Sequence, residues 1–255
     1  MKVVIDSAKT LEENAAAYFE LAKKAKKKLV GAKQVVERMR DRKEEIVEKK
    51  VQAPKRIVQR EWFEKFRWCF AASGQLLVGG RDATTNELVM KKHADQDDLV
   101  FHTEIKGSPF MVIKAGGKPI SEATRMEAAV FTLCASKAWK AELGGAEVLC
   151  VKPDQVTKHA NAGEFLTKGA FVIRGETKHL RPALEFAVGV YEEKMMGGPL
   201  SAVQANCEKW VRIAPGDGKP SDVARKIKRA LGGDLDDIVR VLPSGGCRVV
   251  VGDGR

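Results

Sequence analysis

The chain has 255 residues, of which 44% are hydrophobic and 31% are charged, and its formal net charge at pH 7 is +11. This composition is typical of a folded protein with a sizeable core. It argues against a membrane protein, because no apolar run approaches the roughly 20 residues that span a bilayer. The five cysteines form no CxxC pair, which disfavours a disulfide framework or a zinc ribbon and favours reduced thiols in the cytoplasm.

Most of the positive charge lies in the first 60 residues, which hold 17 Lys and Arg against 9 Asp and Glu. The remaining residues hold 28 against 25 and are close to neutral. A basic arm indicates an anionic partner, and RNA is the partner we expect for a cytoplasmic protein without lipid-binding signals. A helix that is basic only for solubility has the same composition, so charge alone leaves both interpretations open.

Residues 11–51 predict one long helix, because they contain no proline, one glycine and many Ala, Glu, Lys and Arg residues. Apolar residues recur there at alternating steps of four and three, which is the heptad pattern of a coiled coil. These residues are Leu11, Ala15, Tyr18, Ala22, Ala25, Leu29, Ala32, Val36, Met39 and Ile46. About 40 residues at ~1.5 Å each predict a rod of roughly 60 Å, which we expect to end at Pro54. No second long heptad segment follows, so we expect a second copy or another polypeptide to cover the apolar stripe.

From Trp62 onward, short β-rich runs alternate with helical patterns, which predicts an α+β domain with a mixed, largely antiparallel sheet and packed helices. A short helix is predicted after Asp82 as its N-cap, and a longer one from Ser121 to Glu142. The predicted strands are Phe66–Ala71, Leu76–Gly79, Leu99–Thr103, Phe110–Lys114, Ala146–Val151 and Ala170–Arg174.

A Gly-rich break at residues 197–199 suggests that a small α/β tail follows. The tail is predicted to contain the strands Trp210–Ala214 and Arg248–Val251, a helix from Ser221 to Leu231 capped by Ser221, and a short helix Leu235–Val241. We therefore divide the chain into a basic coiled-coil helix (1–60), a mixed domain (61–190) and a small extension (191–255).

The segment DDLVFHTEIKGSPFMVIK (97–114) predicts a strand–turn–strand unit in which His102 and Glu104 point to the same side. Zinc deaminases contain a His-x-Glu pair, but the Pro-Cys-x-x-Cys that completes their metal site is missing here. Ser108 has no Gly-x-Ser-x-Gly elbow, which disfavours a hydrolase triad. We expect no metal, no cofactor and no catalysis here, although the sequence leaves open a third ligand from another histidine.

Three loops combine cations with residues suited to nucleic acid. GGRDATTNE (79–87) places Arg81 before a helix start, where it could hold a phosphate or pair with Asp82 or Glu87. SKAWK (136–140) contains Trp139, which could stack on a base or lie in the core. The long polar loop 152–175 is the third.

From these loops and their surroundings we predict two sets of site residues. The predicted RNA contacts are Arg81, Lys91, Lys106, Lys114, Lys137, Trp139, Lys140, Lys158, Lys168 and Arg174. The residues predicted to shape the surface are Asp82, His102, Glu104, Gly107, Ser108 and Gln155.

Four motifs in order resemble the NFACT-R domain, the RNA-binding module of NFACT-family proteins. They are FRWCFAASGQLLVGGRDATTNELVMKKH, DLVFHTEIKGSPFMVIK, EATRMEAAVFTLCASKAWK and VKPDQVTKHANAGEFLTKGAFVIRG. The arm LEENAAAYFELAKKAKKKLVGAK resembles the second helix of the coiled coil that precedes this domain in the family. The tail VRIAPGDGKPSDVARKIKRAL is similar to the extension of archaeal-type, RqcH/NEMF-like members, so the resemblance covers residues 1 to about 240.

The resemblance implies a binding protein of ribosome-associated quality control that is not an enzyme. Family members bind obstructed large ribosomal subunits and recruit tRNA, which implies large-subunit RNA and tRNA as partners in the cytoplasm. The NFACT-N domain, where the family places its tRNA-recognition residues, has no counterpart in this sequence. The resemblance therefore implies that a separate NFACT-N polypeptide or a second copy pairs with the long helix. The alternative is a stand-alone RNA-binding protein of tRNA modification or metabolism.

Overall fold

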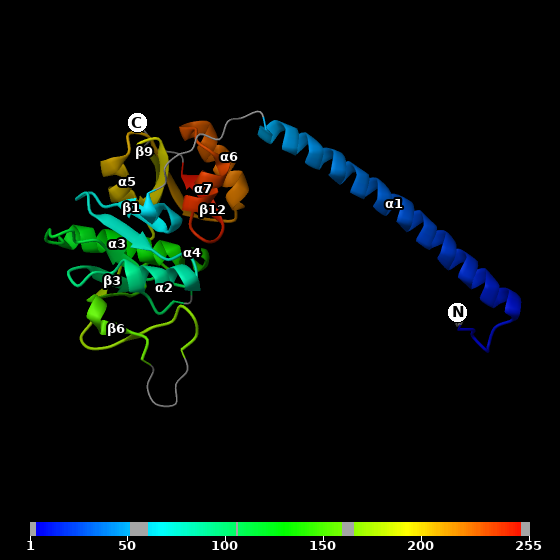
Figure 1. Cartoon of the computed structure of the whole chain (residues 1–255), viewed down its shortest axis with the longest axis horizontal. Helices are drawn as coiled ribbons and strands as arrows, with labels where there is room; N and C mark the ends of the chain where they lie inside the picture. The colour runs from blue at the N-terminus through cyan, green and yellow to red at the C-terminus, as the bar shows by residue number, and fades with distance from the viewer. Residues whose placement is uncertain (1–3, 52–60, 106, 160–165, 251–255) are drawn as a thin grey trace. The chain divides into compact units, whose positions relative to one another are not determined.

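The computed structural model describes residues 4–51, 61–105, 107–159 and 166–250 (Figure 1). The chain divides into two compact units, residues 1–59 and 60–255, and each is described by itself. The predicted end of the rod at Pro54 and the predicted RNA contact of Lys106 lie outside the described residues. No helix in the described part combines the length and the apolar character that crossing a membrane requires.

The first unit contains the predicted long helix, α1 (Leu11–Val51). Thr10 and Glu13 form a capping box at its start: the Thr10 hydroxyl accepts from Glu13 N at 3.2 Å, and Thr10 N donates to Glu13 Oε2 at 2.9 Å. Three residues of the heptad stripe, Leu11, Val36 and Met39, are 80%, 65% and 68% exposed. Within the described part of this unit, the apolar stripe is therefore uncovered.

The second unit is α+β, as predicted, and every strand pairing among its described residues is antiparallel. A six-stranded sheet has the order β1 (Arg67–Phe70), β2 (Leu76–Gly79), β4 (Met111–Ile113), β3 (Leu99–His102), β5 (Val148–Val151) and β8 (Lys178–Leu180). A four-stranded sheet has the order β10 (Lys194–Pro199), β9 (Phe186–Tyr191), β11 (Trp210–Pro215) and β12 (Cys247–Val250). β6 (Val156–Thr157) and β7 (Val172–Ile173) form a separate ribbon.

One helix, α3 (Glu122–Ala135), joins the two main sheets. It packs against β3, β4 and β5 of the larger sheet and against β9 and β10 of the smaller one (Figure 1). The other helical segments are η1 (Trp62–Lys65), α2 (Ala83–Lys92), α4 (Ala138–Ala141), η2 (Pro153–Gln155), α5 (Leu200–Asn206), α6 (Pro220–Leu231) and α7 (Leu235–Val241). The main core therefore extends across both sheets.

The central strands of the larger sheet are buried on both faces, which explains their continuous apolar runs. Val78 and Val112 are paired neighbours that face a smaller core with Val89 of α2. The alternating residues Leu77 and Met111 face the main core instead.

The predicted helix 121–142 is interrupted at Ser136, which corrects that prediction. The backbone of Ser136 is extended (φ −91°, ψ 179°), so α3 ends at Ala135 and α4 begins at Ala138. The Ser136 hydroxyl donates to the carbonyl of Leu133 at 2.7 Å and accepts from Ala138 N at 3.1 Å. A serine that bonds the local backbone in this way competes with the helix.

The predicted break at residues 197–199 is also wrong, because these residues form part of β10. A Cβ on Gly197 would lie 2.7 Å from the carbonyl oxygen of Val241, and one on Gly198 would lie 2.8 Å from the sulfur of Cys69. The glycines therefore permit close packing and are not a linker. The boundary predicted at residue 190 falls in the β9–β10 hairpin, and β8, β9 and α5 were not predicted at all.

The start of α6 differs from the prediction as well. Lys219 is the N-cap residue and Pro220 is the first helical residue, so Ser221 is not the cap. Proline suits this position, because its fixed φ is helical and the hydrogen-bond donor that it lacks would have no partner there.

Candidate nucleic-acid interface

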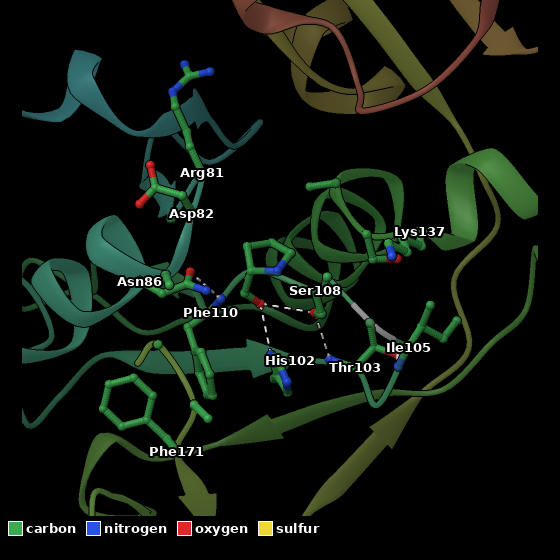
Figure 2. A pocket seen from close by; sticks show the side chains of 18 of the residues that line it. Arg81, Asp82, Asn86, His102, Thr103, Ile105, Ser108, Phe110, Lys137 and Phe171 are labelled. Carbon is green, nitrogen blue, oxygen red and sulfur yellow. Dashed lines mark hydrogen bonds between the residues drawn. The ribbon is translucent and has the colours of Figure 1, made fainter. Parts of the chain in front are cut away.

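A groove of about 620 Å³ opens at the end of β3, where several segments of the second unit converge (Figure 2). We call it the basic groove. It is lined by Arg67, Asn86, Ser244 and residues 80–83, 102–105, 107–110, 135–137 and 167–171. It brings together eight predicted site residues: Arg81, Asp82, His102, Glu104, Gly107, Ser108, Lys137 and Lys168.

The β3–β4 loop forms one wall of the basic groove, and it confirms the predicted strand–turn–strand unit. Ser108 is buried, and its hydroxyl accepts from Thr103 N at 3.1 Å and donates to the Pro109 carbonyl at 3.1 Å (Figure 2). Gly107 has a φ of +80°, which glycine adopts more readily than other residues. A Cβ there would lie 3.4 Å from the side chain of Lys137, so the turn and the lysine are in close contact.

His102 presents an aromatic, uncharged surface to the groove. Its ring is stacked on Phe110, with centroids 4.1 Å apart and an interplanar angle of 7°. Burial lowers the pKa of His102, although a hydrogen bond to Pro109 and the charge of Glu104 raise it. Nδ1 lies 3.0 Å from the Pro109 carbonyl, so in the neutral ring Nδ1 carries the hydrogen and Nε2 is an acceptor. Among the described residues, no group of three His, Cys, Asp or Glu side chains could hold a metal ion.

Arg81 is held by backbone carbonyls, and not by an ion pair with Asp82 or Glu87. Its guanidinium donates to the carbonyls of Phe66 and Arg240, each at 2.7 Å, and extends away from the β3–β4 loop (Figure 2). Burial, followed by the charges of Arg67 and Arg240, lowers the pKa of Arg81 to about 9. Among the described residues it has no carboxylate partner, although Asp82 raises its pKa.

Asp82 is the N-cap of α2, as predicted. Its carboxylate accepts from the backbone N–H of Thr85 at 2.8 Å, and this hydrogen bond lowers the pKa of Asp82. The start of α2 is therefore fixed at the edge of the groove.

Arg67 belongs to the groove but was not predicted. It donates to the hydroxyl of Ser244 at 2.8 Å and to the carbonyl of Leu242 at 3.4 Å, and burial lowers its pKa. In the sequence, its charge within an otherwise apolar predicted strand is the feature that could have indicated a functional or structural role. Asn86 was also missed: its side-chain oxygen accepts from Phe110 N at 3.1 Å and ties α2 to the β3–β4 loop.

Lys137 and Lys168 supply exposed charge at the groove. Within the described ranges, neither takes part in an ion pair. Together with Arg67 and Arg81 they give four cations against two lining carboxylates, Asp82 and Glu104. The groove therefore has an excess of positive charge.

Lys158 and Lys91 lie outside the groove lining and share one carboxylate. Lys158 lies 2.6 Å from Glu87 and 4.5 Å from the ring centroid of Phe171, and Lys91 lies 3.4 Å from Glu87. The bond from Lys158, followed by one from Gly169 N, lowers the pKa of Glu87 to about 2. Lys158 therefore links α2 to the segment around Phe171, whereas Lys91 pairs with Glu87 within the helix.

Lys114 and Trp139 are structural residues, which corrects their prediction as RNA contacts. Lys114 forms ion pairs with Asp95 and the buried Asp98, and donates to the carbonyl of His93. Trp139 is fully buried, and its indole N–H donates to the carbonyl of Gly246 at 3.0 Å. Neither side chain presents a free polar face.

The remaining predicted residues lie away from the groove lining. Lys140 is exposed, and Arg174 donates to the carbonyl of His159 at 3.1 Å. Gln155 donates to the carbonyls of Arg174 at 2.9 Å and Glu176 at 2.7 Å, so it shapes the neighbouring loop rather than the groove.

Residues 65–175 match the family model described as NFACT protein RNA binding domain. Apart from Ser244, the residues that line the groove fall inside this range. The chain is 43% identical over 200 residues to the archaeal Rqc2 homolog aRqcH of Methanocaldococcus jannaschii, a match that covers 75% of this chain and 30% of that protein. It is 34% identical over 195 residues to the ribosome quality control complex subunit NEMF homolog of Drosophila melanogaster, covering 74% and 20%.

The chain thus spans less than a third of the length of these two relatives. Among solved structures, it is similar to the C-terminal part of a fibronectin/fibrinogen-binding protein from Streptococcus suis. That similarity has a TM-score of 0.40 at 20% identity and covers 68% of this chain and 76% of the other.

Proposed function

We propose that the basic groove is an RNA-binding site, from the premise that residues 65–175 match the family model described as NFACT protein RNA binding domain. The observation that carries the proposal is the excess of cations in one open groove. Lys137 and Lys168 are exposed there without a carboxylate partner among the described residues. Lysine and arginine contacts to phosphate supply most of the affinity of such sites.

The groove also offers groups that suit an unpaired base. His102, which is stacked on the buried Phe110, and the partly exposed Phe171, which lies in edge contact with Phe110 at a centroid distance of 5.0 Å, lie in its wall. Single-stranded or looped RNA exposes bases that stack on aromatic rings and phosphates that bind lysine. We therefore place a loop or strand end of a folded RNA in the groove.

We further propose that the protein acts in ribosome-associated quality control in the cytoplasm, as a binding protein rather than an enzyme. It would bind obstructed large ribosomal subunits and support tRNA recruitment to stalled nascent chains. The names of its relatives, a ribosome quality control complex subunit among them, support this role. The exposed stripe of α1 supports a coiled-coil partner, either a separate NFACT-N polypeptide or a second copy.

Affinity purification of the full chain from its native cells, with sequencing of the bound RNA and identification of the bound proteins, tests this proposal. Large-subunit RNA together with tRNA and an NFACT-N protein is the expected result. Recovery of tRNA with modification enzymes and without large subunits would favour the stand-alone role instead. Recovery of no RNA above a mock purification would contradict both.

A further inference from the structure

A second, smaller pocket of about 270 Å³ lies between the first turn of α3 and the edge of the larger sheet formed by β5 and β8. We call it the α3 pocket. Cations from three separate segments line it: Arg125 of α3, Lys152 after β5 and Lys178 of β8. The carboxylate in its lining is that of Glu176. None of the residues that line it belongs to the basic groove.

Arg125 has hydrogen-bonding capacity that the described protein does not use. Its Nη1 donates to Glu122 at 2.5 Å, and Glu122 is itself exposed. Its Nε is buried and has no partner. Buried donors without an acceptor are uncommon in folded proteins, and an ordered water or a bound anion is one way to satisfy such a donor.

A buried arginine Nε without a partner also occurs at the basic groove. In the described residues, three buried side-chain atoms lack a partner: Nε of Arg81, Nε of Arg125 and Nε2 of His93. Two of the three belong to arginines that line the two pockets. The α3 pocket therefore shares with the groove both its charge and its unsatisfied guanidinium.

The other two cations, Lys152 and Lys178, are free to bind an anion, and hydrogen bonds fix the backbone of the pocket wall. Within the part of the chain that the structure describes, neither Lys152 nor Lys178 takes part in an ion pair, and both are exposed. Gln155 fixes the wall: its side chain accepts from Lys152 N at 2.9 Å and donates to the Glu176 carbonyl at 2.7 Å. Cys150, opposite Lys178 in the sheet, adds no negative charge, because burial raises the pKa of its thiol.

We infer that the α3 pocket is a second anion site and that it binds a phosphate group. A phosphate offers several acceptor oxygens in different directions, which suits donors that converge from α3, β5 and β8. Its source is either the backbone of a bound RNA or a free phosphorylated molecule. The pocket lies at the opposite end of α3 from the basic groove, about ten residues or ~15 Å along the helix.

The experiment follows the side-chain Nε–H of Arg125 by NMR in the full chain labelled with ¹⁵N-arginine, with Arg125→Lys used to assign the signal. The probes are inorganic phosphate, and a single-stranded oligouridylate without terminal phosphates. Sodium chloride at equal ionic strength is the control anion. A saturable shift with phosphate, absent with chloride, is expected.

Matched variants show whether the pocket itself is responsible. In Lys152→Gln/Lys178→Gln, phosphate affinity should fall by about tenfold. It should stay unchanged in Lys118→Gln/Lys209→Gln, which removes two exposed lysines elsewhere. The groove variant Lys137→Gln/Lys168→Gln should keep the Arg125 response, so the α3 pocket can be judged even if the proposed function fails.

The two probes distinguish the source of the phosphate. A shift with the oligouridylate that weakens in Lys152→Gln/Lys178→Gln assigns the site to RNA. A shift with inorganic phosphate alone assigns it to a free phosphorylated ligand. The same response to chloride and phosphate, or equal phosphate affinity in both lysine pairs, would overturn the inference.

Discussion

The guanidinium of Arg81 donates a hydrogen bond of 2.7 Å to the carbonyl of Arg240, which lies 159 residues further along the chain. Arg67 binds the carbonyl of Leu242 and the hydroxyl of Ser244 in the same region. Because α7 ends at Val241, both guanidiniums lie at a helix C-terminus, where carbonyls lack partners and carry partial negative charge. The two partly buried arginines of the groove therefore also attach the C-terminal extension.

Replacing Arg81 with alanine is expected to destabilise the protein. It leaves the carbonyls of Phe66 and Arg240 without their charged donor, and hydrogen bonds to charged groups contribute about 1.5–3 kcal/mol each. Denaturant unfolding should show a loss of at least ~1.5 kcal/mol, with a smaller loss for Arg81→Lys. A stability equal to that of the control Lys118→Gln would show that these bonds contribute nothing.

The double variant Lys137→Gln/Lys168→Gln is expected to bind RNA less tightly while staying folded. Each lysine that contacts a phosphate should lower the slope of log K against log salt by about one. Both side chains are exposed, so the free energy of unfolding should change by no more than ~0.5 kcal/mol. Filter binding over a salt series measures the slope, and an unchanged slope would place the RNA elsewhere.

Ser108→Ala tests the wall formed by the β3–β4 loop. The substitution leaves Thr103 N buried without its acceptor, which costs about 1–3 kcal/mol. Denaturant unfolding should show that loss, and RNA affinity should fall because the loop packs against His102 through Pro109 and contacts Lys137. Ser73→Ala, at an exposed serine outside the groove lining, is the comparison for RNA affinity. If Ser108→Ala and Ser73→Ala change RNA affinity equally, the β3–β4 loop does not contribute to the RNA-binding site.

Stability should decrease in acid through Glu87. Lys158 and Gly169 N lower the pKa of this carboxylate to about 2 in the folded protein, below its unfolded value. The stabilisation is therefore present above pH ~4.5 and is lost as the pH falls towards 2. Lys158→Gln should reduce this acid dependence, as measured by thermal unfolding at several pH values. If the variant loses thermal stability at low pH to the same extent as the unmodified chain, that loss arises from other carboxylates.

Val36→Glu tests the partner of α1. This residue of the heptad stripe is 65% exposed, and a charge there should prevent another helix from packing. Co-purification of a coiled-coil partner, or self-association in sedimentation, should be lost. Lys27→Gln, off the heptad stripe, should leave it intact; equal loss with both variants would indicate a contact based on charge.

The sequence predicted the elements whose pattern is local. The runs around Phe101 and Met111 produced the hairpin, and Asp82 marked the start of α2, because alternation and capping depend on neighbouring residues. Lys114 and Trp139 were predicted incorrectly, because their contacts depend on partners outside the local sequence, Asp98 for the lysine and Gly246 for the tryptophan.

The glycines of β10 misled the prediction for a related reason. Gly197 and Gly198 look like a linker in sequence, but the close approach of Val241 and Cys69 requires residues without a side chain. Arg67 was missed because its partners, Leu242 and Ser244, lie more than 170 residues away. Half of the predicted site residues do line the groove, since the loops that carry them were recognised from composition.

The carbonyls at the end of α7 and an anion in the groove would both accept hydrogen bonds from Arg67 and Arg81. A phosphate that accepts the N–H groups which Arg67 and Arg81 give to the carbonyls of Leu242 and Arg240 would compete with the attachment of α7. Such opposition is reciprocal, because each event weakens the other by the same free energy. A substitution that disturbs residues 240–244, well outside 65–175, would therefore change how the groove binds an anion.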